Sequence, residues 1–125
     1  VAVVGGGDSA AEEATYLAKL CTKVHLIVRR EEMRASKIMQ QRVLNTPNIT
    51  IHWNTETDEI LGDDHGVNAV RLKNNKTGEK ITIPVKGFFL AIGHKPNTDI
   101  FKDIITMDEA GYIKVKPGST HTNVE

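Results

Sequence analysis

The strongest constraint on the fold lies in the first ten residues, where a short apolar run is followed by three glycines and then by a helical pattern. Val1–Val4 is a continuous apolar run, which is typical of a strand buried on both faces of a parallel sheet. From Asp8 onward the apolar residues recur at helical spacing, and Asp8 or Ser9 is expected to cap this helix. The chain is therefore expected to begin with a strand, a tight glycine turn and a helix.

The spacing of the small residues in this turn, Gly5-x-Gly7-x-x-Ala10, matches the G-x-G-x-x-G/A pattern of dinucleotide-binding units. The first glycine permits the turn, the second lets the backbone approach a pyrophosphate, and the small third residue lets the helix pack on the strand. The helix N-terminus then binds the anion, with the Ser9 hydroxyl as a further donor. The alternative is an ordinary glycine-rich turn between a strand and a helix. The spacing therefore predicts a pyrophosphate site that includes Gly5, Gly7, Ser9 and Ala10.

Three arginines follow the second predicted strand, at the position that distinguishes the two nicotinamide dinucleotides. In NAD-binding units an acidic residue there bonds the ribose 2′-hydroxyl, whereas in NADP-binding units an arginine accommodates the 2′-phosphate. Guanidinium groups offer forked donors that match a phosphate. Arg29, Arg30 and Arg34 therefore predict NADPH rather than NADH. The alternative is a solvated helix face on which Glu31 and Glu32 pair with these arginines.

The remaining pattern predicts an α/β fold, a Rossmann-like three-layer domain with helices on one face of a parallel sheet and an antiparallel β-meander on the other. A second helix is expected from near Glu32 to Leu44, before Pro47. Beyond Asn97 the pattern weakens to a turn or short helix, one strand and a polar loop, which cannot build a core of their own. The predicted strands are Val1–Val4, Val24–Val28, Ile49–Trp53, Glu56–Leu61, Val67–Leu72, Ile81–Val85, Gly87–Gly93 and Tyr112–Val115.

The composition excludes several classes of partner. The 16 basic and 16 acidic residues give a formal net charge of zero, so neither nucleic acid nor a membrane surface is an expected partner. The apolar runs are far shorter than the roughly 18 residues of a membrane span, and a cytoplasmic location is expected. Cys21, the single cysteine, cannot form an internal disulfide and is expected to be a small buried hydrophobe. No spacing of Cys and His predicts a metal site, and the histidines are assigned no chemistry.

Three blocks of the sequence resemble the low-molecular-weight thioredoxin reductases, which are flavoprotein disulfide reductases with two dinucleotide-binding domains. The blocks are Gly5–Ala10 followed by Glu12-Glu13, Arg29-Arg30 followed by Arg34-Ala35, and Ala91–Asn97. Their order and spacing fit the family over essentially the whole chain. One departure is Val28, where the family usually has a histidine, and this has no bearing on phosphate binding.

The resemblance implies a fragment of a larger enzyme in which hydride passes from NADPH to FAD and electrons then pass to a Cys-x-x-Cys pair and a thioredoxin disulfide. Residues 1–94 would be the NADPH-binding domain, and residues 95–125 the interdomain connector and return segment of the FAD domain. The family pattern also places Asp8 in the pyrophosphate turn. Gly93 would lie beside the cofactor, and His94–Asn97 would be the segment about which the domains rotate. The full-length enzyme is expected to be a homodimer. The chain itself is expected to bind NADPH and to be inactive alone, because the flavin site and the dithiol are not in it.

Two alternatives stay open at this level. The first is the NADPH domain of a flavoprotein without the dithiol, such as a ferredoxin-NADP reductase of this fold. The second is a stand-alone nucleotide-binding regulatory module without catalysis. The residues before Val1 would distinguish the first alternative from a thioredoxin reductase.

Overall fold

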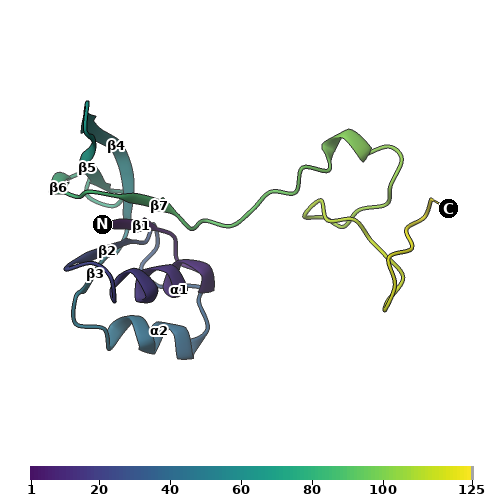
Figure 1. Ribbon diagram of the computed structural model, residues 1–125, viewed down its shortest axis with the longest axis horizontal. Helices are drawn as coiled ribbons and strands as arrows, with labels where there is room; N and C mark the ends of the chain where they lie inside the picture. Colours follow the sequence, from purple (N-terminus) through teal and green to yellow (C-terminus); the bar gives the residue numbers. More distant parts are fainter. Residues whose placement is uncertain (125) are drawn as a thin grey trace. The chain divides into compact units, whose positions relative to one another are not determined.

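A four-stranded parallel sheet forms the centre of the first part of the chain (Figure 1). The computed structural model describes residues 1–124, and the chain divides into two compact units, Val1–Gly93 and a second that begins at His94. In the sheet the strands lie in the order β3-β2-β1-β7, and every neighbouring pair is parallel. The strands are β1 (Ala2–Val4), β2 (Val24–Ile27), β3 (Ile49–His52) and β7 (Phe88–Leu90).

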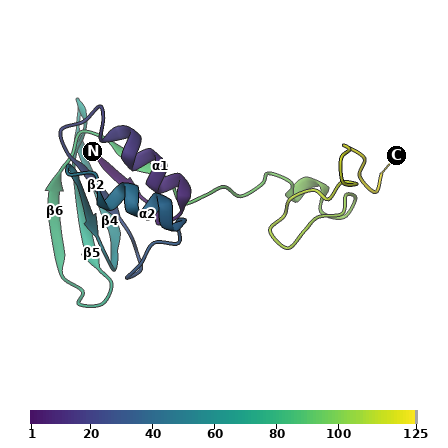
Figure 2. The same ribbon diagram turned by 90° about the horizontal axis from the view of Figure 1, so that it is seen from below.

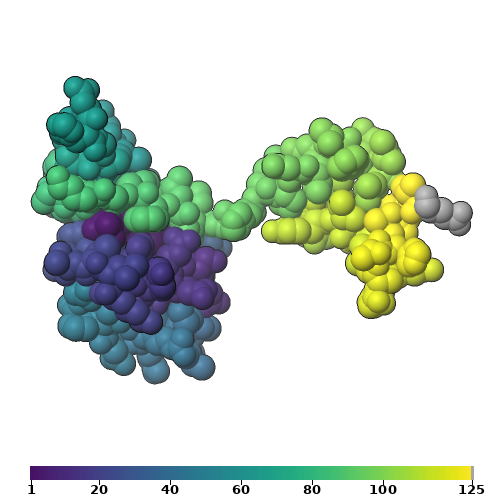
Figure 3. Space-filling view, viewed as in Figure 1, coloured from purple at the N-terminus to yellow at the C-terminus, as the bar shows by residue number. Residues whose placement is uncertain are grey.

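Two further layers cover the sheet. The helices α1 (Asp8–Leu17) and α2 (Lys37–Leu44) connect neighbouring parallel strands and pack side by side on one face (Figures 1 and 2). An antiparallel meander packs on the other face, and Figure 3 shows it in teal and green opposite the purple and blue helices. Its strands are β4 (Thr55–Asp63), β5 (Gly66–Asn74) and β6 (Lys80–Pro84). This arrangement confirms the predicted fold class.

Alternation along the central strands divides the apolar residues between two cores. Val3 and Leu26 point to the helix side, where they pack with the alanines of α1. Ala2 and Ile27 point to the meander side, where they pack with fully buried residues of β5. All four side chains are completely buried. Burial of each large aliphatic side chain contributes roughly 1.5–3 kcal/mol, so these two cores hold the three layers together.

Close packing at Gly5 sets the position of α1 on the sheet. The Gly5 backbone has φ of +149°, a conformation that favours glycine. A Cβ atom there would lie 2.8 Å from Cβ of Ala10 and closer still to the carbonyl oxygen of Ala91. The turn after β1 is therefore closely packed between α1 and Ala91, the residue that follows β7.

The first helix begins at Asp8 as predicted, but its cap and the start of the second helix differ from the prediction. The N-cap of α1 is Gly7 and no side chain caps it, so the prediction that Asp8 or Ser9 caps the helix is wrong. The Asp8 carboxylate instead accepts a hydrogen bond from the backbone N–H of Ser36 at 2.8 Å. The second helix begins at Lys37 rather than near Glu32, because the chain before it bonds to the glycine turn instead of to itself.

The second unit has little regular structure. A 3-10 turn, η1 (Asp99–Phe101), lies within the segment predicted as a turn or short helix. The strand predicted at Tyr112–Val115 is wrong, since this segment forms only an isolated antiparallel bridge between Met107 and Ile113. No residue from 94 to 124 is buried, so this segment has no core of its own, as the sequence predicts. Within residues 1–124 no helix has the length and apolar character that crossing a membrane requires.

Two histidines that the sequence left without a role are paired on neighbouring strands. Nδ1 of His25 in β2 lies 3.0 Å from Nε2 of His52 in β3, and both side chains are partly buried. Burial lowers the pKa of both rings, and the adjacent His52 ring contributes to lowering the pKa of His25 to about 4. The folded chain therefore keeps this pair neutral under conditions in which an unfolded chain begins to protonate it.

The stability of the chain is expected to fall as the pH drops from about 6.5 toward 4. Over that range the unfolded chain binds a proton at residue 25 that the folded chain does not, so the free energy of unfolding decreases by about 1 kcal/mol after allowance for solvent screening of a partly exposed ring. Urea unfolding at pH 7 and pH 5 measures this loss. In His25→Gln the loss should shrink, whereas the control His65→Gln, in an exposed turn, should keep it. An unchanged pH dependence in His25→Gln would contradict the assignment.

Substitution of Gly5 by alanine is expected to destabilise the chain by at least about 2 kcal/mol, because the new methyl group collides with backbone and helix and the φ angle disfavours it. Gly7→Ala is the matched control, since its Cβ would meet nothing within 4 Å and its φ of −96° suits any residue. Its cost should be about 0.5–1 kcal/mol, because alanine is a poorer N-cap residue than glycine, and should stay well below the cost of Gly5→Ala. Equal losses for the two variants in urea unfolding would show that the packing at Gly5 is not what positions α1.

Candidate functional site

A cleft of about 560 Å³ opens at the carboxyl ends of the parallel strands. Its volume lies in the range of pockets that bind small molecules. The walls come from the turn after β1, the segment after β2, the start of β4 and the end of β7 with the residues that follow it. All but one of the predicted site residues line it: Gly5, Gly7, Asp8, Ser9, Arg29, Arg30, Arg34 and Gly93. The exception is Ala10, which is fully buried.

The glycine turn leaves the N-terminus of α1 open to the cleft. A Cβ at Gly7 would meet nothing within 4 Å, so the absent side chain leaves room for a ligand. The first intrahelical bond runs from the N–H of Ala11 to the Gly7 carbonyl at 3.1 Å. Among residues 1–124, no hydrogen bond uses the backbone N–H of Asp8, Ser9 or Ala10. Asp8 and Ser9 line the cleft, so their two backbone donors and the positive end of the helix dipole are available to an anion there.

The loop that carries the arginines is bonded directly to this turn. The Gly6 carbonyl accepts hydrogen bonds from the backbone N–H groups of Arg34 at 2.6 Å and Ala35 at 3.0 Å. The Asp8 carboxylate accepts from Ser36, the next residue along. These bonds hold Arg34 beside the helix N-terminus. The Asp8 side chain therefore connects the glycine turn to the arginine loop, in addition to the place of Asp8 in the predicted pyrophosphate turn.

The three arginines are exposed and not engaged by acidic neighbours. Within residues 1–124 no ion pair includes Arg29, Arg30 or Arg34, so the alternative in which Glu31 and Glu32 pair with them is absent from the structure.

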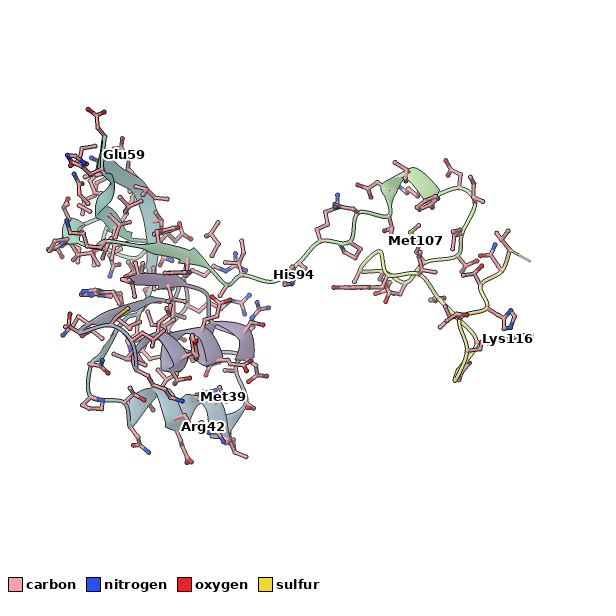
Figure 4. All side chains as sticks on the ribbon, viewed as in Figure 1. Met39, Arg42, Glu59, His94, Met107 and Lys116 are labelled. Atoms are coloured by element: carbon pink, nitrogen blue, oxygen red, sulfur yellow. The ribbon has the colours of Figure 1, made fainter. Side chains whose placement is uncertain are left out.

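The ion pairs that do form lie elsewhere. Arg71 of β5 pairs with Asp58 at 2.6 Å and with Glu59, which lies in the middle of β4 and is labelled in Figure 4. The hydrogen bond from Arg71 holds the pKa of Asp58 below its usual value. The cationic side chains at the cleft are by contrast open to an anionic ligand.

Sequence reasoning missed several residues of the cleft. Gly6, the variable position of the motif, is constrained as well, because a Cβ there would lie 3.2 Å from Cγ1 of Val28. The opposite wall is formed by the start of β4, which the sequence predicted only as part of the meander. Thr57 in this wall has a buried hydroxyl oxygen without a hydrogen-bond partner among residues 1–124. The run of three glycines could have indicated that Gly6 belongs to the cleft. Nothing in the sequence indicated that β4 lies beside the glycine motif.

Gly93 ends the first unit at the rim of the cleft. Its φ of +103° lies in the region that favours glycine, and its backbone is exposed. A Cβ there would meet nothing within 4 Å. The glycine is therefore required by the conformation of the chain after β7, and it keeps this wall of the cleft free of a side chain.

The whole chain, residues 1–125, matches the model of the family described as pyridine nucleotide-disulphide oxidoreductase. The chain belongs to this family. The match extends over the glycine turn, the arginine loop and the second unit alike. Membership agrees with a cleft that presents backbone donors and arginines at the carboxyl end of a parallel sheet.

Relatives within this family are thioredoxin reductases. The chain is 48% identical to NADPH-dependent thioredoxin reductase 3 of Arabidopsis thaliana over 126 residues. This match covers 100% of the chain and 24% of the relative. It is 50% identical to the mitochondrial thioredoxin reductase of Kluyveromyces lactis, covering 99% of the chain and 36% of the relative. The solved thioredoxin reductase of Lactococcus lactis matches 98% of the chain and 40% of its own length, with a TM-score of 0.85 and 38% identity. The resemblance found from sequence is thereby confirmed, and the chain spans well under half of these relatives.

Removal of the Asp8 side chain is expected to increase the local mobility of the loop that carries the arginines, near Ser36. In Asp8→Ala the backbone N–H of Ser36 loses its acceptor, so its hydrogen exchange should accelerate about fivefold, the equivalent of roughly 1 kcal/mol. Asp8→Asn retains an acceptor oxygen and should exchange much more slowly than the alanine variant. Exchange followed by NMR measures both. If the Ser36 amide exchanged as slowly in Asp8→Ala as in the unmodified chain, the hydrogen bond from Ser36 to Asp8 would not exist in solution.

Proposed function

We propose that the first unit is an NADPH-binding domain. The observation that carries the proposal is that Arg29, Arg30 and Arg34 line the same cleft as the free backbone donors at the N-terminus of α1. A dinucleotide with a 2′-phosphate presents two anionic groups, and the cleft presents two matching groups of donors. An NAD-binding unit would instead carry an acidic residue at the end of β2.

Each part of the cofactor has a proposed position. The turn from Gly5 to Ala10 binds the pyrophosphate through backbone N–H groups, with the Ser9 hydroxyl as an added donor. The three arginines bind the 2′-phosphate, and Gly93 lies beside the cofactor on the opposite wall. NADPH supplies a hydride when bound, and the residues of this chain bind and orient it. The open space at Gly7 and the unpaired arginines both fit such a ligand.

For the whole protein we propose the activity of a thioredoxin reductase. In this proposal a second domain carries FAD and a Cys-x-x-Cys pair, and the protein reduces a thioredoxin disulfide as a homodimer. Support comes from the names of the relatives, one of which is NADPH-dependent. The single cysteine, Cys21, is partly buried and cannot serve as that dithiol.

The division of labour along the chain is part of the same proposal. Residues 1–94 form the NADPH-binding domain, and residues 95–125 form the connector and the return segment of the FAD domain. The exposed apolar side chains of the second unit are consistent with a surface that packs on further protein: Ile100, Phe101, Ile104, Tyr112, Ile113, Val115 and Val124. A cytoplasmic location stays a prediction, since one relative carries a mitochondrial name.

The chain is expected to bind NADPH more tightly than NADH, and Arg30→Ala should remove much of this preference. Loss of charged hydrogen bonds to the 2′-phosphate would weaken NADPH binding by about 1–3 kcal/mol and leave NADH binding unchanged. Isothermal titration of the 125-residue chain with each nucleotide measures this. The matched control is Arg42→Ala on α2, outside the cleft (Figure 4), which should change neither affinity.

Two results would contradict the proposal. Equal affinity of the unmodified chain for NADPH and NADH would overturn the assignment of the arginines to a 2′-phosphate. A parallel loss of both affinities in Arg30→Ala would show that Arg30 supports the fold or the pyrophosphate rather than the 2′-phosphate.

A further inference from the structure

The turn between β5 and β6 reaches back to the arginine loop, although the two are far apart in sequence. The side-chain amide of Asn75 donates a hydrogen bond of 2.7 Å to the backbone carbonyl of Arg29, 46 residues earlier. The backbone N–H of Asn75 also donates to the carbonyl of Asn54 at 2.7 Å, and Asn54 in turn donates to the carbonyl of Arg30 at 3.0 Å. The meander turn thus contacts the main chain of Arg29 directly and that of Arg30 through Asn54.

This contact begins where the pairing between β2 and β3 ends. Val28 still donates to the His52 carbonyl at 2.9 Å and accepts from the N–H of Thr55 at 3.0 Å. Beyond Val28 the next carbonyls, those of Arg29 and Arg30, accept from Asn75 and Asn54 instead of from a neighbouring strand. Because a side chain leaves the backbone in a direction set by the main-chain conformation, these bonds fix the positions from which the Arg29 and Arg30 side chains extend.

The turn that carries Asn75 is itself well ordered by hydrogen bonds. The side-chain oxygen of Asn74 accepts from the backbone N–H groups of Lys76 at 2.8 Å and Thr77 at 3.0 Å. Gly78, with φ of +75°, donates to the Asn74 carbonyl at 2.8 Å. Asn75 is therefore presented by a turn with a defined conformation, which suits a role in positioning another residue.

We propose that Asn75 is a positioning residue that holds Arg29 in place for the 2′-phosphate and so contributes to the selection of NADPH over NADH. This inference rests on the proposed function of the cleft. Asn75 does not line the cleft, and it acts through the main chain of Arg29. In this way the meander, which is remote from the glycine motif in sequence, contributes to the selection of NADPH over NADH.

The test compares nucleotide affinities of the 125-residue chain and its variants by isothermal titration. Asn75→Ala should weaken NADPH binding about three- to tenfold while NADH binding changes less than twofold, because only the 2′-phosphate depends on the position of Arg29. The control is Asn68→Ala near the start of β5, whose amide donates to Asp63 at 3.1 Å and which does not line the cleft. It should change neither affinity.

A double-mutant cycle shows whether Asn75 acts through Arg29. In a chain that already carries Arg29→Ala, the added Asn75→Ala should change NADPH affinity less than twofold, since the group that it positions is gone. An undiminished effect in that background, or an unchanged ratio of NADPH to NADH affinity in Asn75→Ala, would overturn the inference and leave the proposed function intact. A failure of the unmodified chain to prefer NADPH would instead overturn the proposed function.

Discussion

The site depends on the close approach of α1 and the segment after β7 at the turn that follows β1. Gly5 fits between Ala10 of α1 and the Ala91 carbonyl after β7, with no space for a side chain. This packing places the N-terminus of α1 at the carboxyl edge of the sheet and leaves its first backbone donors facing a cleft. The same turn bonds the arginine loop through the Gly6 carbonyl and the Asp8 carboxylate. One tight turn therefore aligns both groups of donors that the proposed cofactor requires.

Much of this arrangement could be predicted from the sequence, because it follows from local patterns. The spacing Gly5-x-Gly7-x-x-Ala10 predicts the strand, turn and helix, and the continuous or alternating apolar runs distinguish buried parallel strands from the meander. The arginines after β2 could be assigned to the cleft because parallel strands end at a common edge. Each of these inferences depends on residues that are near one another in the chain.

The features that could not be predicted depend on contacts between distant segments. The second helix begins five residues later than expected from Glu32, at Lys37, because the preceding backbone bonds to Gly6 and Asp8. The pairing of His25 with His52 required the register of β2 on β3. The strand predicted at Tyr112–Val115 is wrong because a short alternating run forms a strand only beside a partner strand, and within residues 94–124 it finds only one isolated bridge.

NMR mapping would show whether the cleft binds the two anionic parts of NADPH as proposed. Amide shifts of the chain are compared on addition of NADPH and of NADH. We expect both nucleotides to perturb the amides of Gly5–Ala10, and the difference between the two nucleotides to be confined to Arg29–Ser36. Perturbations centred elsewhere, for example between α1 and α2, or identical spectra at Arg29–Ser36 with the two nucleotides, would contradict it.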